Sequence, residues 1–167
     1  MPLNLLLRYN SHLDISGLPA SQRITSLKGI FERDFTNQVT LSLNGKRITP
    51  TPIDGQIPME TLFRHLTTVI IDQKTRSREF EMDRSKRLHW VKYHLEGNKK
   101  SDMLIFSVKE PDGNRTYVYD IAEKYVIVLE PKPKNIYFLL SAYHLKGKDA
   151  ARDKMLKKYK RKLDEIL

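Results

Sequence analysis

Basic, aromatic and hydroxyl side chains recur in the second half of the chain at spacings that suit chemistry on a phosphate. Arg84, Arg87 and His94 fall on one flank of a predicted helix, and Ser141 and Tyr143 alternate on a strand-like run. Cleavage of RNA without a metal needs a base for the 2′-hydroxyl proton, an acid for the 5′-oxygen and cations for the phosphorane. Because the substrate supplies the nucleophile, these residue types are sufficient for the reaction.

Each candidate residue also has an alternative interpretation in which it has no role in function. The helix flank could be a solvated face, and the serine and tyrosine could be ordinary exposed strand residues. Arg76 and Arg78, in the polar stretch before the helix, could clamp a phosphate or only face solvent. His89, on the other flank of the helix, is the alternative proton carrier to His94. His65 is interpreted as a structural residue.

The net charge is concentrated in two segments of the chain. The 167 residues include 30 Lys and Arg and 20 Asp and Glu, a formal net charge of +10. Segment 74–100 has nine basic and four acidic residues, and segment 146–162 has nine and two. Two such segments indicate a polyanion site, although they could also be solvated helices. The candidate nucleic-acid-binding residues, expected to contact phosphates in a salt-sensitive way, are Lys92, Lys154, Lys157, Lys158, Lys160 and Arg161.

Several classes of site have no counterpart in the sequence. The absence of cysteine excludes disulfides, cysteine zinc sites and a thiol nucleophile. There is no glycine-rich phosphate loop, dinucleotide fingerprint or nucleophile elbow. The histidines are scattered and the acidic residues are not clustered, so we expect neither a metal site nor a cofactor. No run approaches the roughly 20 apolar residues of a membrane span, and no signal peptide is recognisable. We therefore expect a cytoplasmic protein without membrane contact.

The elements that must position these residues begin with helices and one hairpin. The pattern predicts a helix over 19–34, a hairpin over 38–49, a short helix over 58–66, a loop over 72–82 and a helix over 83–96. Asn44-Gly45 between two alternating runs is the strongest hairpin signal. Pro58 suits the first turn of a helix, and Asp83 can cap one.

Four strand-like runs and a basic helix follow. The runs lie at 103–108, 116–120, 125–129 and 136–143. Their connections are too short for a crossover helix, so the strands must form an antiparallel meander. A basic helix is predicted from Gly147 to Leu163. The fold class is therefore α+β: N-terminal helices and a small hairpin, then a four-stranded antiparallel β-meander and a basic C-terminal helix.

We predict an N-terminal extension, residues 1–57, and a main α+β domain, residues 58–167. On the last strand, the even-numbered residues of 136–142 are predicted to face the core. The odd-numbered residues of 137–143 share the other face, which places Ser141 beside Tyr143.

Parts of the chain resemble the phage- and toxin-associated nucleases grouped with barnase, EndoU, colicin D and RelE. The segments that carry the resemblance are Thr75–Arg84, Arg87–Lys92, Tyr125–Glu130 and Tyr137–Tyr143, followed by the lysine-rich helix. It covers residues 58–162 and rests on motif order. In that group a helical part precedes a four-stranded antiparallel sheet that carries a metal-independent RNA-cutting site.

The resemblance implies an endoribonuclease acting on RNA, such as a tRNA, with a possible protein inhibitor or immunity partner. The pattern of the group suggests Arg78, Arg84, Arg87 and the Ser141/Tyr143 pair as site positions. The His–His–Lys set of EndoU-like members does not map onto this chain, and residues 1–57 lie outside the resemblance.

The leading hypothesis is a metal-independent endoribonuclease that uses 2′-hydroxyl attack. The three arginines would bind the scissile phosphate, His89 or His94 and Tyr143 would exchange protons, and Ser141 would orient the substrate. The alternatives are a non-catalytic nucleic-acid-binding adaptor or inhibitor, and a structural protein whose basic helix contacts an acidic partner. The leading hypothesis expects the basic residues of both segments to meet over a single sheet surface.

Overall fold

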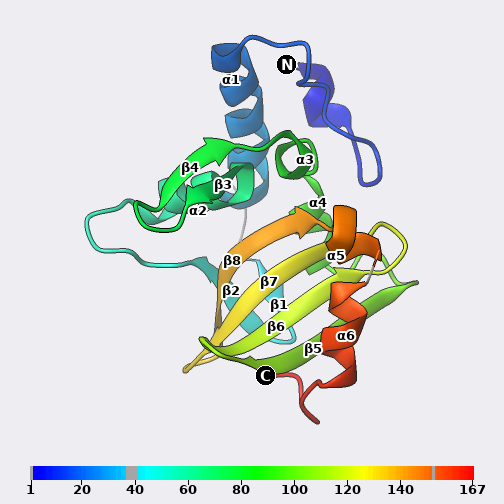
Figure 1. Ribbon diagram of the computed structural model, residues 1–167. Coiled ribbons are helices and arrows are strands. Elements are labelled where there is room, and N and C mark those ends of the chain that lie inside the picture. The colour runs from blue at the N-terminus through cyan, green and yellow to red at the C-terminus, as the bar shows by residue number, and fades with distance from the viewer. Residues whose placement is uncertain (1, 37–40, 152) are drawn as a thin grey trace.

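A six-stranded mixed sheet forms the centre of the molecule (Figure 1). The computed structural model describes residues 2–36, 41–151 and 153–167. The strands of the sheet, in spatial order, are β1 (Ser42–Leu43), β2 (Lys46–Pro50), β8 (Ile136–His144), β7 (Tyr125–Lys132), β6 (Gly113–Asp120) and β5 (Met103–Glu110). Consecutive strands from β5 to β8 pair antiparallel, whereas β2 runs parallel to β8.

The predicted α+β class is confirmed, but the predicted four-stranded sheet is too small. The N-terminal hairpin extends it, because β2 pairs with β8 from Arg47↔Ile136 to Pro50↔Leu139. Asn44 and Gly45 have φ values of 53° and 76°, the left-handed geometry that a two-residue hairpin turn requires. Docking on β8 buries Leu43 and Ile48, which would be exposed on an isolated hairpin. The predicted residues 38–40 lie outside the described residues.

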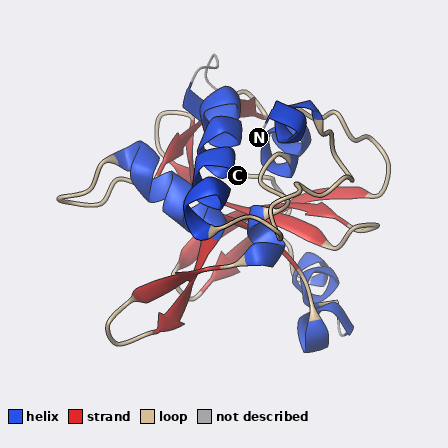
Figure 2. Cartoon of the chain, turned by 90° about the horizontal axis from the view of Figure 1, so that it is seen from above, coloured by secondary structure: helices blue, strands red, loops and turns tan. Residues whose placement is uncertain are grey.

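Helices cover both faces of the sheet (Figure 2). One face packs beneath α1 (Ala20–Phe31), α2 (Pro58–Thr67), α3 (Met82–Ser85), α4 (Trp90–Leu95) and the π-helical η2 (Glu32–Thr36). The N-terminal η1 (Pro2–Leu6) packs against α1, where Asn4 donates a hydrogen bond to Ser26. The other face packs against α5 (Gly147–Ala151) and α6 (Lys154–Lys160). No helix in the described part of the chain has the length and apolar character needed to span a bilayer.

A bulge in β8 corrects the predicted core face of that strand. Val128 lies opposite Ser141 while its neighbour Leu129 lies opposite Leu139, so β8 contains one extra residue between them. The side chains of Tyr137 and Leu139 are buried, although they were expected on the open face. The bulge shifts the alternation, so Ser141 lies with Val128 on the opposite face from Leu139. Ser141 and Tyr143 still share a face, as predicted.

A second, two-stranded sheet occupies much of the stretch that was predicted to be a loop. Its strands are β3 (Thr68–Asp72) and β4 (Ser77–Phe80), which pair antiparallel. The prediction failed because β4 has only four residues, of which Phe80 alone is apolar, so the segment shows no alternating apolar pattern. Arg76, in the turn between the strands, has a positive φ of 61°. The hairpin continues directly from α2 and carries Arg78 toward the main sheet.

Two predicted helices are interrupted. The helix predicted over 83–96 consists of α3 and α4, with turns between Lys86 and His89. The terminal helix is divided into α5 and α6, because Asp153 adopts φ 42° and its side chain accepts the backbone N–H of Leu156. Because neither helix is continuous, the continuous flanks assumed from the sequence do not exist.

A buried carboxylate ties the N-terminal segment to the sheet. Asp120 is fully buried and accepts hydrogen bonds from the Tyr9 hydroxyl (2.5 Å), His94 Nε2 (2.9 Å) and the ammonium of Lys99. The backbone N–H of Glu123 donates a further bond. Burial opposes ionisation of Asp120, but these hydrogen bonds outweigh it and hold its pKa well below the usual range. The carboxylate therefore stays charged and fixes three separate segments.

We expect Asp120→Asn to lower the free energy of unfolding by about 3 kcal/mol at neutral pH, since it breaks a buried charge network. The folded-state pKa of Asp120 is depressed, so its contribution is fully present above the unfolded pKa of about 3.9. It is lost as the pH falls through the folded value. Urea unfolding from neutral to acid pH checks both points. Asp112→Asn, at an exposed turn, is the matched control; an equal effect of both substitutions would contradict the account.

Candidate functional site

A cavity of about 350 Å³ opens at the edge of β8, beyond the point where β2 ends. Its polar lining is Thr51, His65, Arg76, Arg78, Arg84 and Ser141. Its apolar lining is Val69, Ile70 and Leu140. We call this cavity the arginine pocket. Residues from α2, the β3–β4 hairpin, α3 and β8 meet there, so the pocket depends on the tertiary fold rather than on one local motif.

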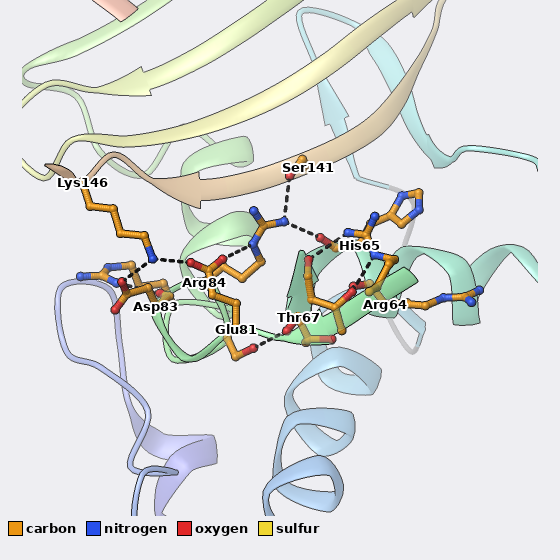
Figure 3. Close-up of polar contacts among 12 residues, drawn as sticks. Arg64, His65, Thr67, Glu81, Asp83, Arg84, Ser141 and Lys146 are labelled. Atoms are coloured by element: carbon orange, nitrogen blue, oxygen red, sulfur yellow. Dashed lines mark hydrogen bonds and ion pairs between the residues drawn. The ribbon is translucent and has the colours of Figure 1, made fainter. Parts of the chain in front are cut away.

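Arg84 is held rigidly at the pocket wall (Figure 3). Its Nε donates to Glu81 Oε2 at 2.9 Å, and its Nη1 donates to the carbonyl of His65 at 3.1 Å and to Ser141 Oγ at 3.3 Å. The guanidinium carbon also lies 5.7 Å from the centroid of the Tyr143 ring. The structure thus brings together three predicted site residues, although Tyr143 contacts Arg84 and does not line the pocket.

The other arginines of the pocket lack carboxylate partners. Arg78 donates from Nε to Thr68 Oγ1 at 2.7 Å and from Nη2 to the Thr68 carbonyl at 2.9 Å. Arg76 donates to Gln73 Oε1 at 3.0 Å. In the residues that the structure describes, neither guanidinium has an ion pair. Burial lowers the pKa of Arg78, and the charges of Arg84, Arg64 and Arg76 lower it further. The pocket therefore has an excess of positive charge suited to an anion.

His65 also lines the pocket, although it was interpreted from the sequence as a structural residue. Burial lowers its pKa to about 4, and the charges of Arg78, Arg64, Arg84 and Arg76 act in the same direction. Its ring is therefore a neutral imidazole at neutral pH, able to accept a proton. None of the described residues forms a hydrogen bond with the ring nitrogens. Its only signal in the sequence was the adjacent Arg64, which gives no indication that Arg76, Arg78 and Arg84 converge there.

Two hydroxyl groups complete the polar lining. Ser141 Oγ accepts from Arg84 and remains free to donate. Thr51 Oγ1 is buried and has no hydrogen-bond partner among the described residues. A buried hydroxyl without a partner is costly in an empty site, and a ligand or water with a polar group satisfies it.

The remaining predicted catalytic residues lie outside the arginine pocket. Arg87 is 7% exposed and donates from Nη1 to the carbonyl of Asp83 at 2.7 Å. His89 is buried near the carbonyl of Arg8, and its pKa is lowered to about 4, mainly by burial. Both ring nitrogens of His94 face oxygen atoms, those of Trp90 and Asp120, in the buried network described above. The flank assumed for Arg84, Arg87 and His94 fails because α3 and α4 are separate helices.

The basic C-terminal segment lies apart from this pocket. Helix α6 packs on the opposite face of the sheet from α3 and α4, which corrects the expectation of a single shared cationic surface (Figure 1). Lys158 and Arg161 pair with Glu110 at 2.8 and 3.1 Å, and Lys92 pairs with Glu96 at 3.3 Å. Lys154, Lys157 and Lys160 are exposed. Within the described residues, no group of three or more acidic, histidine or cysteine side chains could hold a metal ion.

We expect a small dianion to raise the pKa of His65, because it offsets the surrounding arginines. Sulfate is a suitable probe, since its charge does not change with pH in this range. Its affinity should therefore increase as the pH falls toward 4, the pKa of free His65. NMR titration of the histidine ring protons, with and without sulfate, measures the shift. Arg84→Met should weaken the response, and an ordinary pKa near 6.5 for His65 in the free protein would contradict this description.

No protein-family model, curated protein or solved structure matches this chain. We therefore infer its function from its own residues, starting from those that line the arginine pocket.

Proposed function

We propose that this protein is a metal-independent endoribonuclease and that the arginine pocket is its active site. The observation that carries the proposal is the neutral imidazole of His65 among four arginines, of which Arg84 alone has a carboxylate partner. A phosphate bound there would satisfy the excess charge. A neutral imidazole beside that phosphate would supply the base that 2′-hydroxyl attack needs.

In the proposed reaction, the scissile phosphate of the substrate binds to Arg78 and Arg84. The ring of His65 takes the proton of the 2′-hydroxyl as the bond from the 2′-oxygen to phosphorus forms. The bond from phosphorus to the 5′-oxygen breaks, and that oxygen takes a proton from water at the mouth of the pocket. The products are a 2′,3′-cyclic phosphate and a 5′-hydroxyl. Fixed guanidinium groups stabilise the added negative charge of the phosphorane, because they need no rearrangement when it develops.

Binding of the substrate also strengthens the base. The same arginines that lower the pKa of His65 in the free protein are offset by the phosphate charge in the complex. The pKa of His65 then moves toward the operating pH, where proton transfer is most effective. His65 thus becomes a stronger base when a phosphate occupies the pocket.

Ser141 and Tyr143 have positioning roles: Ser141 orients the phosphate and Tyr143 supports Arg84. The hydroxyl of Ser141 accepts from Arg84 and can donate to a non-bridging phosphate oxygen. Burial raises the pKa of Tyr143 to about 12, so the phenol is uncharged at neutral pH. Its ring lies beside the Arg84 guanidinium, and we assign it the role of a positioning residue rather than the proton exchange that the sequence hypothesis gave it.

A non-catalytic RNA-binding protein is the second candidate function. It is favoured by the exposed lysines of α6, which are distant from the pocket and can attract RNA without taking part in chemistry. Both functions give salt-dependent binding. Only the first gives a cyclic phosphate product.

We expect His65→Asn to reduce the rate of RNA cleavage in EDTA by about 100-fold, because the proton acceptor is lost. Arg84→Met should reduce the rate by a similar factor of about 100, because the phosphorane loses a fixed donor. Single-turnover cleavage of an RNA oligonucleotide measures both rates. The control is Lys109→Gln, which removes an exposed charge on β5 and should leave the rate unchanged. A folded wild-type protein that leaves RNA intact in EDTA rules out the proposal.

Two substitutions of Tyr143 separate positioning from proton transfer. Tyr143→Phe keeps the ring beside Arg84, so we expect a rate within about twofold of wild type, since a cation–π contact needs no hydroxyl. Tyr143→Leu removes the ring and should lower the rate about tenfold, as expected for loss of 1–2 kcal/mol of support to Arg84. Measuring the rate from pH 5 to 9 adds a second readout. A large loss in Tyr143→Phe would instead make the phenol the acid.

A further inference from the structure

The arginine pocket is larger and more apolar than a phosphate alone needs. Its volume of about 350 Å³ falls in the range of about 300–1,000 Å³ that is typical of pockets for organic ligands. A water molecule occupies roughly 30 Å³, so a phosphate, which has five non-hydrogen atoms, fills only part of this cavity. The rest of the lining includes the aliphatic side chains of Val69, Ile70 and Leu140, which an inorganic anion cannot use.

These three aliphatic side chains are accessible from the pocket, and we call them the aliphatic wall. Each of them is half-buried and lines the cavity. Val69 and Ile70 belong to β3, and Leu140 belongs to β8, so two different strands hold the wall in place. A ligand that covers this apolar surface removes it from water, which favours binding.

The aliphatic wall lies directly beside the groups that would bind the phosphate. In the β3–β4 hairpin Ile70 is paired with Arg78. Directly opposite residues of two antiparallel strands place their side chains on the same face, with Cβ atoms about 5 Å apart. On β8, Leu140 precedes Ser141, whose Oγ accepts from Arg84 at 3.3 Å. A phosphate ester held by the two arginines can therefore place its organic group against the wall.

The position of His65 determines which nucleoside reaches the wall. His65 lies in the last turn of α2, which continues directly into β3, and it lines the same cavity as Val69 and Ile70. In the proposed reaction its ring accepts the proton of the 2′-hydroxyl, so the ribose that carries this hydroxyl lies inside the pocket. The base is attached to the next carbon of that ribose and therefore enters the same cavity. The leaving nucleotide, by contrast, takes its proton at the mouth.

We propose that the aliphatic wall binds the nucleobase of the ribonucleotide that supplies the attacking 2′-hydroxyl. The inference rests on the proposed function for the identity of the ligand, since the wall itself requires only a phosphate ester with an apolar part. The pocket then takes a nucleoside 3′-phosphate as one unit. Arg78 and Arg84 bind the phosphate, and His65 faces the ribose. One flat face of the base packs on Ile70 and Leu140. Holding the base and the phosphate together places the 2′-oxygen for attack on phosphorus.

Binding of uridine 3′-monophosphate and of sulfate tests this inference without any cleavage. Calorimetric titration at pH 8, where both ligands are dianions, gives the two affinities. We expect the nucleotide to bind about tenfold more tightly than sulfate, because its base buries apolar surface that sulfate leaves in water. Ile70→Ser should weaken nucleotide binding about fivefold, because part of that apolar contact is lost. The same variant should leave sulfate binding unchanged.

Two further variants control for folding and for position. Ile71→Ser is the matched control, because Ile71 is the next residue of β3, is 55% exposed and is not among the lining residues of the pocket. It should change neither affinity. Leu140→Ser repeats the test from β8 and should weaken nucleotide binding alone. Sulfate binding needs the assembled pocket, so an unchanged sulfate affinity also shows that a variant is folded.

The outcomes separate the base site from the proposed function. Equal affinities for nucleotide and sulfate would overturn the base site, as would an unchanged nucleotide affinity in both the Ile70 and Leu140 variants. Tighter binding of uridine 5′-monophosphate than of the 3′ isomer would also overturn it, because the base would then belong to the leaving nucleotide. If RNA is still cleaved in these cases, the proposed function stands without the base site. If the nucleotide binds as expected but RNA stays intact in EDTA, the proposed function fails and nucleotide binding at the wall is supported.

Discussion

The site depends on the guanidinium of Arg84, which joins the helical layer to the free edge of β8. Its three hydrogen bonds reach Glu81, the His65 carbonyl and Ser141, and so connect α2, α3 and the sheet. These bonds are possible because β2 ends opposite Leu139 and leaves the rest of β8 open to the helices. Glu81 is engaged by Arg84 and Lys146, and among the described residues no other carboxylate pairs with the arginines around His65. The positive pocket follows from this arrangement.

Local sequence signals predicted the type and order of most elements. The turn at Asn44-Gly45, the helix that begins at Pro58 and the strands β5 to β8 depend on residues close together in the chain, so their patterns were sufficient. Parallel docking of β2 on β8 and the bulge in β8 depend on long-range packing. A strict period of two does not allow for an extra residue, so the buried face of β8 was assigned incorrectly before the bulge, whereas Ala142 after it is buried as predicted.

The candidate site was predictable only in part. Arg78, Arg84 and Ser141 were named from the sequence and line one pocket, with Tyr143 alongside. The assumption of one continuous helix grouped His94 with Arg84, and the turns between α3 and α4 separate them. His65, the one imidazole of the pocket, had only the adjacent Arg64 as a local signal. Its environment comes from a hairpin that the sequence did not reveal, and a single histidine in an amphipathic helix has no feature that marks such surroundings.

The most direct test of the central claim uses a DNA oligonucleotide that contains one ribonucleotide, incubated with the protein in EDTA. Attack by a substrate 2′-hydroxyl on a phosphate in the arginine pocket predicts one cut, on the 3′ side of the ribose, that leaves a 2′,3′-cyclic phosphate. The same oligonucleotide with a 2′-O-methyl group at that position should stay intact. Cleavage at deoxyribonucleotides, or an uncut ribonucleotide with folded protein bound to it, would contradict the account.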